Sequence, residues 1–328
     1  MTIDPSSEFP PKVAEAWGDF RRSLARRGRT PGTVEVYEKS YRTFWRWALD
    51  NGVDPDPSAV DHRVLNRWTD HLLEATATRN GRPVMVVDPA TGEKVPKLLE
   101  PSTRRILFIN LRPFYSWWSK EEGIDNPFDR ADVPEVPKDP PIPLVELNHI
   151  RAILDTCTSK SDFRDCRDRA LIRVLIDTGA RRGELINMCL EDWDQRNDLV
   201  RLDGKTGQRV VPLSLTTGEA LGSYRRRRAE HRFADLPALW LATKGPLGES
   251  GIAQILYRRC EMAGVPPINP HRFRHTWAHM FRAEGGGEGD LMYLAGWSST
   301  EMAHRYGRSA AMERAQDAAR KISVGDRI

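Results

Sequence analysis

The sequence lacks the features of an exported or membrane-bound protein. Its few cysteines, which form no CxxC pair and show no regular spacing, are Cys157, Cys166, Cys189 and Cys260. No apolar signal segment opens the chain, and no stretch approaches the ~18 consecutive apolar residues that a membrane-spanning helix needs. These absences favour a reduced, cytoplasmic protein without a membrane partner.

The signatures of two enzyme classes are also missing. The chain has no GxxxxGK[ST] loop to bind a nucleotide, and no cluster of Asp and Glu that resembles a two-metal nuclease. His275 and His279 lie four residues apart on an expected helix, but no HExxH motif or cysteine accompanies them. We therefore assign both histidines to packing or hydrogen bonding, and expect no metal and no cofactor.

A strong charge of one sign is absent as well. The chain has 50 Lys and Arg against 46 Asp and Glu, and residues 1–138 hold 21 of each sign. Affinity for a nucleic acid would therefore come from local basic clusters, although such a run is often only a solvated helix face. The residues that we select as candidate DNA contacts are Arg104, Arg105, Arg225 and Arg226.

The first part of the chain has apolar residues at helical spacing. Helices are expected at residues 13–27, 33–49, 58–74 and 102–121. The core positions predicted for the second of these helices are Val36, Tyr37, Tyr41, Phe44, Trp45 and Ala48. Between the third and the fourth, Asn-Gly and Thr-Gly turns flank a Val-Met-Val-Val run, which predicts a hairpin-like insertion at residues 79–97.

Five prolines in residues 129–143 cannot sustain a helix, and this segment is the expected linker between two domains. Beyond it, the pattern predicts helices at residues 144–156 and 164–177, and then two strands, 199–202 and 209–212, that flank a tight turn. Thr216 and Glu219 form a capping-box signal for a further helix. The expected fold is mainly α with a small antiparallel β-sheet.

Four short motifs in the second half are unspecific one by one. They are residues 178–185 (TGARRGEL), 204–207 (GKTG), 271–275 (HRFRH) and 294–299 (LAGWSS), the last followed by Tyr306. In this order and spacing they resemble the active site of the tyrosine recombinases, the family of phage integrases, Xer recombinases and Cre. That site consists of Arg, Lys, His-x-x-Arg, His or Trp, and Tyr. The resemblance extends over roughly residues 12–320.

The resemblance assigns the first three positions. Arg181 matches the first arginine of the family, with Ala180 where leucine is usual. Glu184 matches a buried acid that supports the site. Lys205 falls in the turn between the two strands, where the family keeps a mobile lysine.

The remaining positions follow in order. His271 and Arg274 match the His-x-x-Arg box. Trp297 stands where most members have histidine and where Cre has tryptophan. Tyr306, nine residues further on, matches the nucleophile, and Ser298 with Glu301 forms a capping-box signal for a short helix before it.

The chemistry of phosphoryl transfer explains this set of residue types. Two arginines hold a phosphate whose oxygens gain charge in the transition state, because guanidinium stays protonated and offers a planar fork. Tyr306 can form a 3′-phosphotyrosyl link, and Lys205 can protonate the departing 5′ oxygen. His271 can accept or return a proton, whereas the indole N–H of Trp297 can only donate a hydrogen bond.

The resemblance also implies a domain plan. It consists of a flexible N-terminus (1–11), a helical core-DNA-binding domain (12–128), the linker (129–143), an α+β catalytic domain (144–308) and a C-terminal tail (309–328). The implied partner is double-stranded DNA with paired inverted core sites, bound by a homotetramer in which the tail docks on a neighbouring protomer. An accessory directionality factor is a further partner in some members. The implied location is the cytoplasm of a bacterial cell, with a phage or a mobile element as the source.

Several functions stay open. The core-binding pattern starts close to the N-terminus and leaves no room for the arm-binding domain of lambda-type integrases. The hairpin-like insertion departs from the compact Xer pattern, which favours an integrase over a Xer-like dimer resolvase. A type IB topoisomerase or telomere resolvase fits the helical first domain less well. A DNA-binding protein without catalytic activity is the alternative from a different class.

Overall fold

The computed structural model describes residues 8–79, 81–137, 144–204 and 207–300, together with residues 303, 316, 319 and 320. The chain divides into two units, residues 1–139 and residues 140–328, each with a hydrophobic core of its own. The division falls within the proline-rich stretch. In this described part of the chain, no helix is long and apolar enough to cross a bilayer.

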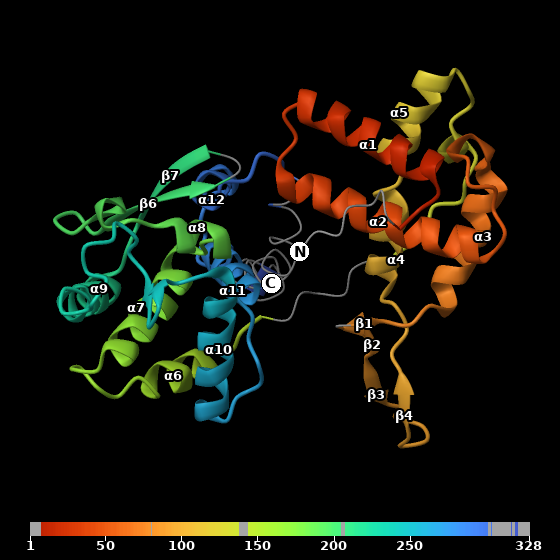
Figure 1. Cartoon of the computed structure of the whole chain (residues 1–328). Helices are drawn as coiled ribbons and strands as arrows, with labels where there is room; N and C mark the ends of the chain where they lie inside the picture. The colour runs from red at the N-terminus through yellow and green to blue at the C-terminus, as the bar shows by residue number, and fades with distance from the viewer. Residues whose placement is uncertain are drawn as a thin grey trace, which may run out of the picture. The chain divides into compact units, whose positions relative to one another are not determined.

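The first unit is helical apart from one β-ribbon (Figure 1). Its helices are α1 (Pro11–Arg26), α2 (Pro31–Asp50), α3 (His62–Glu74), α4 (Pro101–Ile109) and α5 (Arg112–Glu122), with short 3-10 turns η2 (Pro57–Ala59) and η3 (Pro127–Asp129). The ribbon between α3 and α4 consists of β1 (Thr78–Arg79), β2 (Arg82–Pro83), β3 (Met85–Val87) and β4 (Lys94–Pro96). β1 pairs with β2 and β3 pairs with β4, both antiparallel, which confirms the predicted insertion.

Aromatic rings fill the core of the first unit. Phe20 of α1 meets Phe114 of α5 edge to face, with ring centroids 5.5 Å apart, and Phe44 of α2 meets Trp68 of α3 in the same way at 5.7 Å. Edge-to-face pairs of this kind stabilise a core beyond the area that they bury. The hydroxyl of the buried Tyr41 donates to the carbonyl of Val13 at 2.8 Å and ties α2 to α1.

Three sequence-based predictions for this unit are wrong in detail. The helix expected at 102–121 is two helices, because Pro113 has no N–H for a continuous helix and stands in the first turn of α5 instead. The helix expected from residue 58 begins at His62, where the Asp61 carboxylate caps the N–H of Val64. Val36, expected in the core, is 47% exposed, because it lies on the outer face of α2.

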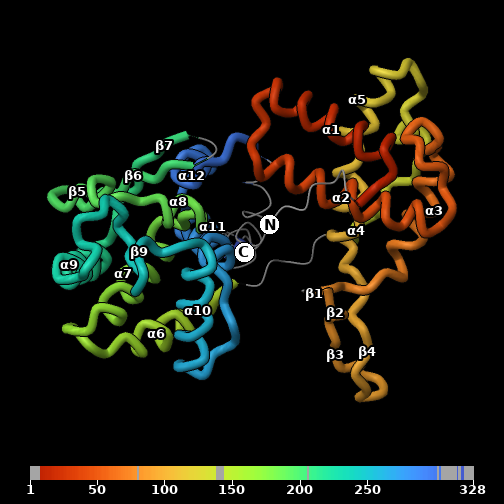
Figure 2. Tube along the Cα trace, viewed as in Figure 1, coloured from red at the N-terminus to blue at the C-terminus, as the bar shows by residue number. Residues whose placement is uncertain are grey.

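The second unit combines helices with a three-stranded antiparallel sheet in the order β5-β6-β7 (Figure 2). Its helices are α6 (Leu147–Asp155), α7 (Phe163–Thr178), α8 (Arg182–Asn187), α9 (Leu215–Arg228), α10 (Glu249–Ala263), α11 (Pro270–Ala283) and α12 (Glu288–Ala295), with the 3-10 turn η4 (Leu190–Asp192). Its strands are β5 (Trp193–Asp194), β6 (Leu199–Gly204), β7 (Gly207–Pro212), β8 (Leu241–Ala242) and β9 (Gly245–Pro246). The buried helix α7 packs against both α9 and α11. The predicted fold class, mainly α with small antiparallel sheets, is confirmed.

The strand pair expected around the turn is confirmed, since β6 and β7 pair from Leu199 with Pro212 to Gly204 with Gly207. The capping box expected at Thr216 and Glu219 is wrong. The N-cap of α9 is Ser214, whose backbone N–H and hydroxyl both donate to Asp177 of α7. A carboxylate from a neighbouring helix therefore anchors the start of α9, and Thr216 lies within the helix.

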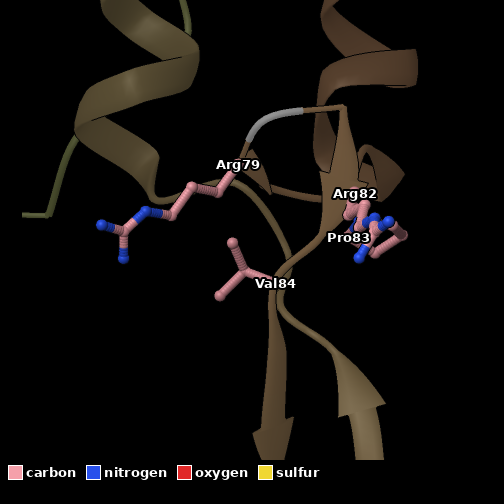
Figure 3. A pocket seen from close by; sticks show the side chains of 4 residues that line it. All are labelled: Arg79, Arg82, Pro83 and Val84. Atoms are coloured by element: carbon pink, nitrogen blue, oxygen red, sulfur yellow. The ribbon is translucent and has the colours of Figure 1, made fainter.

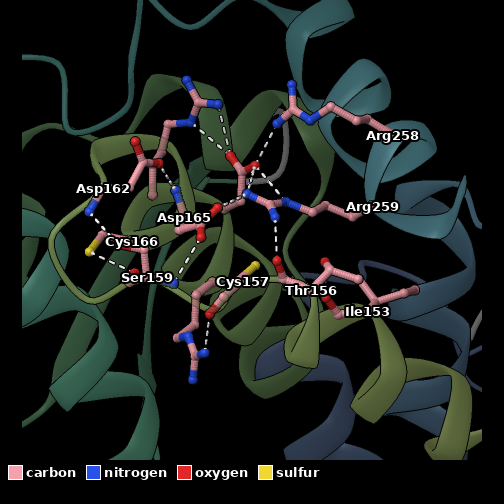
Figure 4. Close-up of polar contacts among 12 residues, drawn as sticks. Ile153, Thr156, Cys157, Ser159, Asp162, Asp165, Cys166, Arg258 and Arg259 are labelled. Carbon is pink, nitrogen blue, oxygen red and sulfur yellow. Dashed lines mark hydrogen bonds and ion pairs between the residues drawn. The ribbon is translucent and has the colours of Figure 1, made fainter. Parts of the chain in front are cut away.

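A buried network of charges joins α7 to α10. Asp168 is fully buried and accepts hydrogen bonds from Arg167, Arg258 and Arg259. Figure 4 shows Arg259 reaching Asp165 and the carbonyl of Thr156 as well, and these contacts measure 2.7 and 2.9 Å. A carboxylate without exposure needs such partners, because burial of a lone charge is costly.

Candidate active site

The site begins where α7 ends. Gly179 terminates this helix in the left-handed conformation, with φ of 56°, and a Cβ at this position would come within 2.4 Å of the ring of Trp277. Only glycine combines that φ with so close an approach. The chain then turns directly into Arg181, which is the N-cap of α8.

Arg181 and Glu184 hold each other at the start of α8. The backbone N–H of Arg181 donates to one carboxylate oxygen of Glu184, and its guanidinium donates to the other, both at 2.8 Å. Arg181 remains one-third exposed while Glu184 is buried. The guanidinium of Arg181 is therefore fixed in direction and still open to a ligand.

A second arginine, Arg209 of β7, shares the same carboxylate. Its two terminal nitrogens donate to both oxygens of Glu184, at 2.9 and 2.7 Å. Burial alone would raise the pKa of Glu184, but the hydrogen bonds from Arg209 and from the backbone of Arg181 lower it to about 2. Glu184 is thus an anion at neutral pH that orients two guanidinium groups.

Sequence reasoning missed Arg209. The available signal was an arginine that alternates with apolar residues on a strand, at a position whose neighbours Val200, Leu202 and Val211 are buried. An inward-facing arginine on such a strand needs a buried acid as its partner. Glu184 is that acid.

Three arginines converge on the last turn of α12. Arg209 donates to the carbonyl of Leu294 at 2.6 Å, Arg274 to that of Ala295 at 2.5 Å, and Arg181 to that of Gly296 at 3.0 Å. Carbonyls at a helix C-terminus lack partners within the helix and carry partial negative charge, so cations stabilise them. The positions of three consecutive carbonyls are therefore tied to three guanidinium groups from different elements.

Arg274 is the most deeply placed of the three. It is 1% exposed, lies on α11, and donates also to the carbonyl of Gly179 at 2.8 Å. Its guanidinium carbon stands 5.2 Å from the ring centroid of Trp297, within cation–π range. Arg274 therefore links the end of α7, the end of α12 and the tryptophan.

His271 occupies the first turn of α11, one turn before Arg274, so the two side chains share a face. The helix start is set by Asn269, whose side chain caps the N–H of Arg272, and by Pro270. His271 is exposed, and its ring meets that of the buried His275 edge to face at 4.9 Å. An exposed imidazole beside a clamped guanidinium can exchange protons with a ligand.

Trp297 follows the left-handed Gly296 that ends α12. It is 7% exposed, and it packs with Ala278, Leu291 and Ala295. Its backbone N–H donates to the carbonyl of Met292 at 2.9 Å. The tryptophan is therefore held between α11 and α12. At this point the chain leaves the arginine cluster, which consists of Arg181, Arg209 and Arg274.

Two of the selected residues, Lys205 and Tyr306, lie outside the described residues. Gly204, which precedes Lys205, is itself part of the cluster, because a Cβ there would stand 2.6 Å from a carboxylate oxygen of Glu184. Strand β6 therefore ends directly against Glu184. The capping box expected at Ser298 and Glu301 and the tail 309–328 also involve residues outside the described part.

The selected DNA contacts lie elsewhere. On α4, Arg104 donates to the carbonyl of Leu99 and Arg105 to that of Pro134, so both brace the first unit. On α9, Arg225 bonds the side chain of Gln195 and Arg226 that of Ser223, and both are exposed. None of these four hydrogen bonds involves the arginine cluster. His275 and His279 are buried in α11, and within the described ranges no group of His, Cys, Asp and Glu is arranged to hold a metal ion.

The fold of the chain matches that of solved DNA recombinases. A Tn1549 transposon integrase in complex with transposon right-end DNA superposes with a TM-score of 0.70, at 17% identity, over 94% of this chain and 99% of the other. The XerH site-specific recombinase bound to palindromic difH substrate superposes with a TM-score of 0.65, at 14% identity, over 94% and 85%. At these low identities, both similarities show a shared fold.

The sequence comparisons identify the family. The phage integrase family matches residues 144–313, which contain the whole arginine cluster. The tyrosine recombinase XerA of Saccharolobus solfataricus is 28% identical over 295 residues, 87% of this chain and 84% of that protein. The chain belongs to the phage integrase family. It is a site-specific tyrosine recombinase, a DNA-binding enzyme that cuts and rejoins DNA strands.

Proposed function

We propose that Tyr306 attacks a DNA phosphodiester held by Arg181 and Arg274. The observation that carries this proposal is the convergence of three guanidinium groups on the end of α12, ten to twelve residues before Tyr306 in the sequence. The tyrosine oxygen forms a bond to phosphorus while the bond from phosphorus to the 5′ oxygen breaks. The phosphate stays on the enzyme as a 3′-phosphotyrosyl ester, and a 5′ hydroxyl from another strand reverses the step.

The other residues divide the proton transfers. His271, exposed beside Arg274, accepts the proton of the Tyr306 hydroxyl. Lys205, directly after the strand that ends against Glu184, donates a proton to the departing 5′ oxygen. Trp297 donates an indole N–H to a phosphate oxygen and transfers no proton. Because the bond energy is kept in the ester, the cycle needs neither ATP nor a metal ion.

The domain plan and the assembly belong to the same proposal. Residues 12–128 bind the core DNA site, residues 129–143 link the domains, and residues 144–308 carry the chemistry. Four protomers act on paired inverted core sites, and the palindromic substrate of XerH supports the inverted arrangement of the sites. An accessory factor sets the direction of the reaction.

A groove on the second unit suits the tail of a neighbouring protomer. This groove of about 500 Å³ lies on α6, α7 and α11 and is lined mainly by apolar side chains, Leu147, Ile150, Ile176, Trp277, Met280 and Phe281. The tail, residues 309–328, contains alanine, methionine, valine and isoleucine at intervals suited to an apolar helix face. We expect removal of residues 309–328 to leave DNA binding intact and to reduce the tetramer on DNA, measured by light scattering.

We favour the integration of a phage or mobile element as the biological role, because the exposed β-ribbon departs from the compact Xer pattern. The sequence relationship to XerA favours a second candidate, the resolution of chromosome or plasmid dimers. Sequencing the DNA recovered from covalent adducts separates the two. Sites at a phage or element junction support integration, and a chromosomal or plasmid dimer site supports resolution.

A nicked suicide DNA substrate tests the chemistry. We expect the wild-type protein to form a covalent adduct and Tyr306→Phe to form none while still binding DNA. Tyr293→Phe is the matched control, because Tyr293 is an exposed tyrosine on α12, and this variant should form the adduct normally. An adduct in Tyr306→Phe would contradict the assignment of the nucleophile. DNA binding without any adduct from the wild type would instead indicate a DNA-binding protein without catalysis.

A further inference from the structure

The β-ribbon between α3 and α4 extends away from the helices of the first unit (Figure 1). Its base is anchored where the N–H of Leu99 donates to the carbonyl of Ala75 and the N–H of Val84 to that of Ala77, both at 2.8 Å. From Thr76 to Leu98, no described residue is buried. The ribbon therefore has a defined backbone and contributes no side chain to the core of the unit.

A ribbon of this kind gains little stability by itself. Isolated two-stranded hairpins are marginal in water, and independent stability needs a third strand or a packed face. Here Met85 and Val87 on one face of β3 are 49% and 59% exposed, and Val86 on the other face is 37% exposed, so neither face is covered. The ribbon therefore offers an exposed surface that a binding partner can cover.

The charges along the ribbon are unevenly placed. Its two acids, Asp88 and Glu93, stand at the tip, where the N–H of Asp88 donates to the carbonyl of Glu93. Its basic residues are Arg79, Arg82, Lys94 and Lys97. The two arginines lie near the base, away from the acidic tip. The base of the ribbon is thus positive, while the tip holds both acids beside Lys94.

Arg79 and Arg82 are the important pair, because they are direct cross-strand partners of β1 and β2. Like charges directly opposite one another destabilise a strand pair. In the described ranges neither side chain has an ion pair or a hydrogen bond, whereas Lys97 pairs with Glu100 at 2.7 Å. Each of the two guanidinium groups therefore carries a positive charge that an external anion beside it would compensate.

The two arginines also border a recess. This recess, of about 470 Å³, is lined by Arg79, Arg82, Pro83 and Val84. Figure 3 shows the two guanidinium groups on either side of Val84. Guanidinium is suited to phosphate oxygens, which it can bind with two N–H groups at once.

We propose that the base of the ribbon, through Arg79 and Arg82, binds the sugar–phosphate backbone of duplex DNA next to the recombination core. The inference rests on the proposed function, which brings DNA to this unit. The ribbon base adds phosphate contacts without reading the sequence, and the acidic tip points away from the duplex. DNA fits better than a second copy of the chain, because the feature that lacks compensation is positive charge.

The salt dependence of DNA binding tests this proposal. The probe is a random-sequence linear duplex, and the proteins are the wild type, Arg79→Gln/Arg82→Gln and Met85→Thr/Val87→Thr. Loss of two phosphate contacts should reduce the slope of log affinity against log salt by about 1.8. Between about 50 and 200 mM salt the wild type should then lose about 12-fold more affinity than the arginine variant. The Met85/Val87 variant should match the wild type.

The outcomes are distinguishable. An unchanged slope in the arginine variant, with adduct formation intact on the suicide substrate, overturns the ribbon inference and leaves the proposed function standing. A wild type that neither binds DNA nor forms an adduct overturns both. Reduced self-association of Met85→Thr/Val87→Thr, without an effect of the arginine pair on the slope, would show that the ribbon binds another copy of the chain. Equal melting temperatures of the three proteins exclude a folding defect.

Discussion

The two units bury different kinds of side chain. In the first unit, aromatic rings dominate, and the buried polar residues that the structure describes there are Ser23 and Ser40. Among its described residues, the second unit buries five arginines, which are Arg167, Arg209, Arg228, Arg259 and Arg274. It also buries the two acids Asp168 and Glu184.

This difference follows from what each unit must hold in place. Buried ion pairs often contribute less stability than apolar residues of the same volume, because both charges lose their hydration. They do hold atoms in defined directions, since a guanidinium fork accepts few geometries. The second unit thus gives up stability to position buried cations, among them Arg209 and Arg274 at the end of α12, whereas the first unit keeps a mostly apolar core.

The largest effect should come from Asp168→Ala. This change leaves the buried Arg167 without an acid and leaves Arg259 with Asp165 as its acid, which costs about 3 to 5 kcal/mol. The matched change in the first unit, Tyr41→Phe, removes one buried hydrogen bond and should cost about 1 kcal/mol. Calorimetric unfolding of the full chain measures both. Equal costs would break the comparison between the units.

The second largest effect should be a loss of stability of the second unit at low pH. The pKa of Glu184 is about 2 in the folded chain against 4.5 ordinarily, so its ionised carboxylate stabilises the fold fully above pH 4.5. That stabilisation, about 3 kcal/mol, is lost as the pH falls from 4.5 towards 2. Melting temperatures measured across this range should fall for the second unit, and by less in Glu184→Gln. A fall of the same size in Glu184→Gln would assign the effect to other groups.

Arg209→Lys should then slow DNA cleavage without weakening DNA binding. Lysine keeps the charge, but it cannot bind both oxygens of Glu184 and the carbonyl of Leu294 together. The resulting displacement should lower the cleavage rate by about 10- to 100-fold. Arg201→Lys is the matched control, because Arg201 lies on the partner strand β6 with its side chain 45% exposed. Equal rates for wild type and Arg209→Lys would refute a positioning role.

The smallest difference should separate two glycines that end helices. Gly179 and Gly123 have φ of 56° and 66°, so alanine at either position should cost about 1 to 2 kcal/mol. Only at Gly179 would the new Cβ meet a neighbour, Trp277, which should add about 1 to 3 kcal/mol. Thermal unfolding of both variants measures the difference. Equal destabilisation by the two alanines would show that the packing around Gly179 is looser than the structure indicates.

Local sequence signals predicted many of the elements correctly. The β6–β7 pair, the ribbon and the end of α7 at Gly179 follow from turn residues and alternation. The error at the start of α9 arose because a neighbouring element decides it. Asp177 of α7 anchors the start of α9, which no local pattern in residues 214–219 reveals.

The sequence by itself determined the family resemblance, the order of the candidate site residues and the division at the prolines, because all three depend on residue type and spacing along the chain. The resemblance named Glu184 as a supporting acid, but only the tertiary structure decided that Arg209 is its partner. Arg209 and Glu184 are 25 residues apart, and Arg274 reaches Gly179 across 95. The partner of a buried charge is chosen by packing, since it must be whichever opposite group the fold brings within hydrogen-bonding distance. Spacing along the chain does not reveal which groups come within that distance.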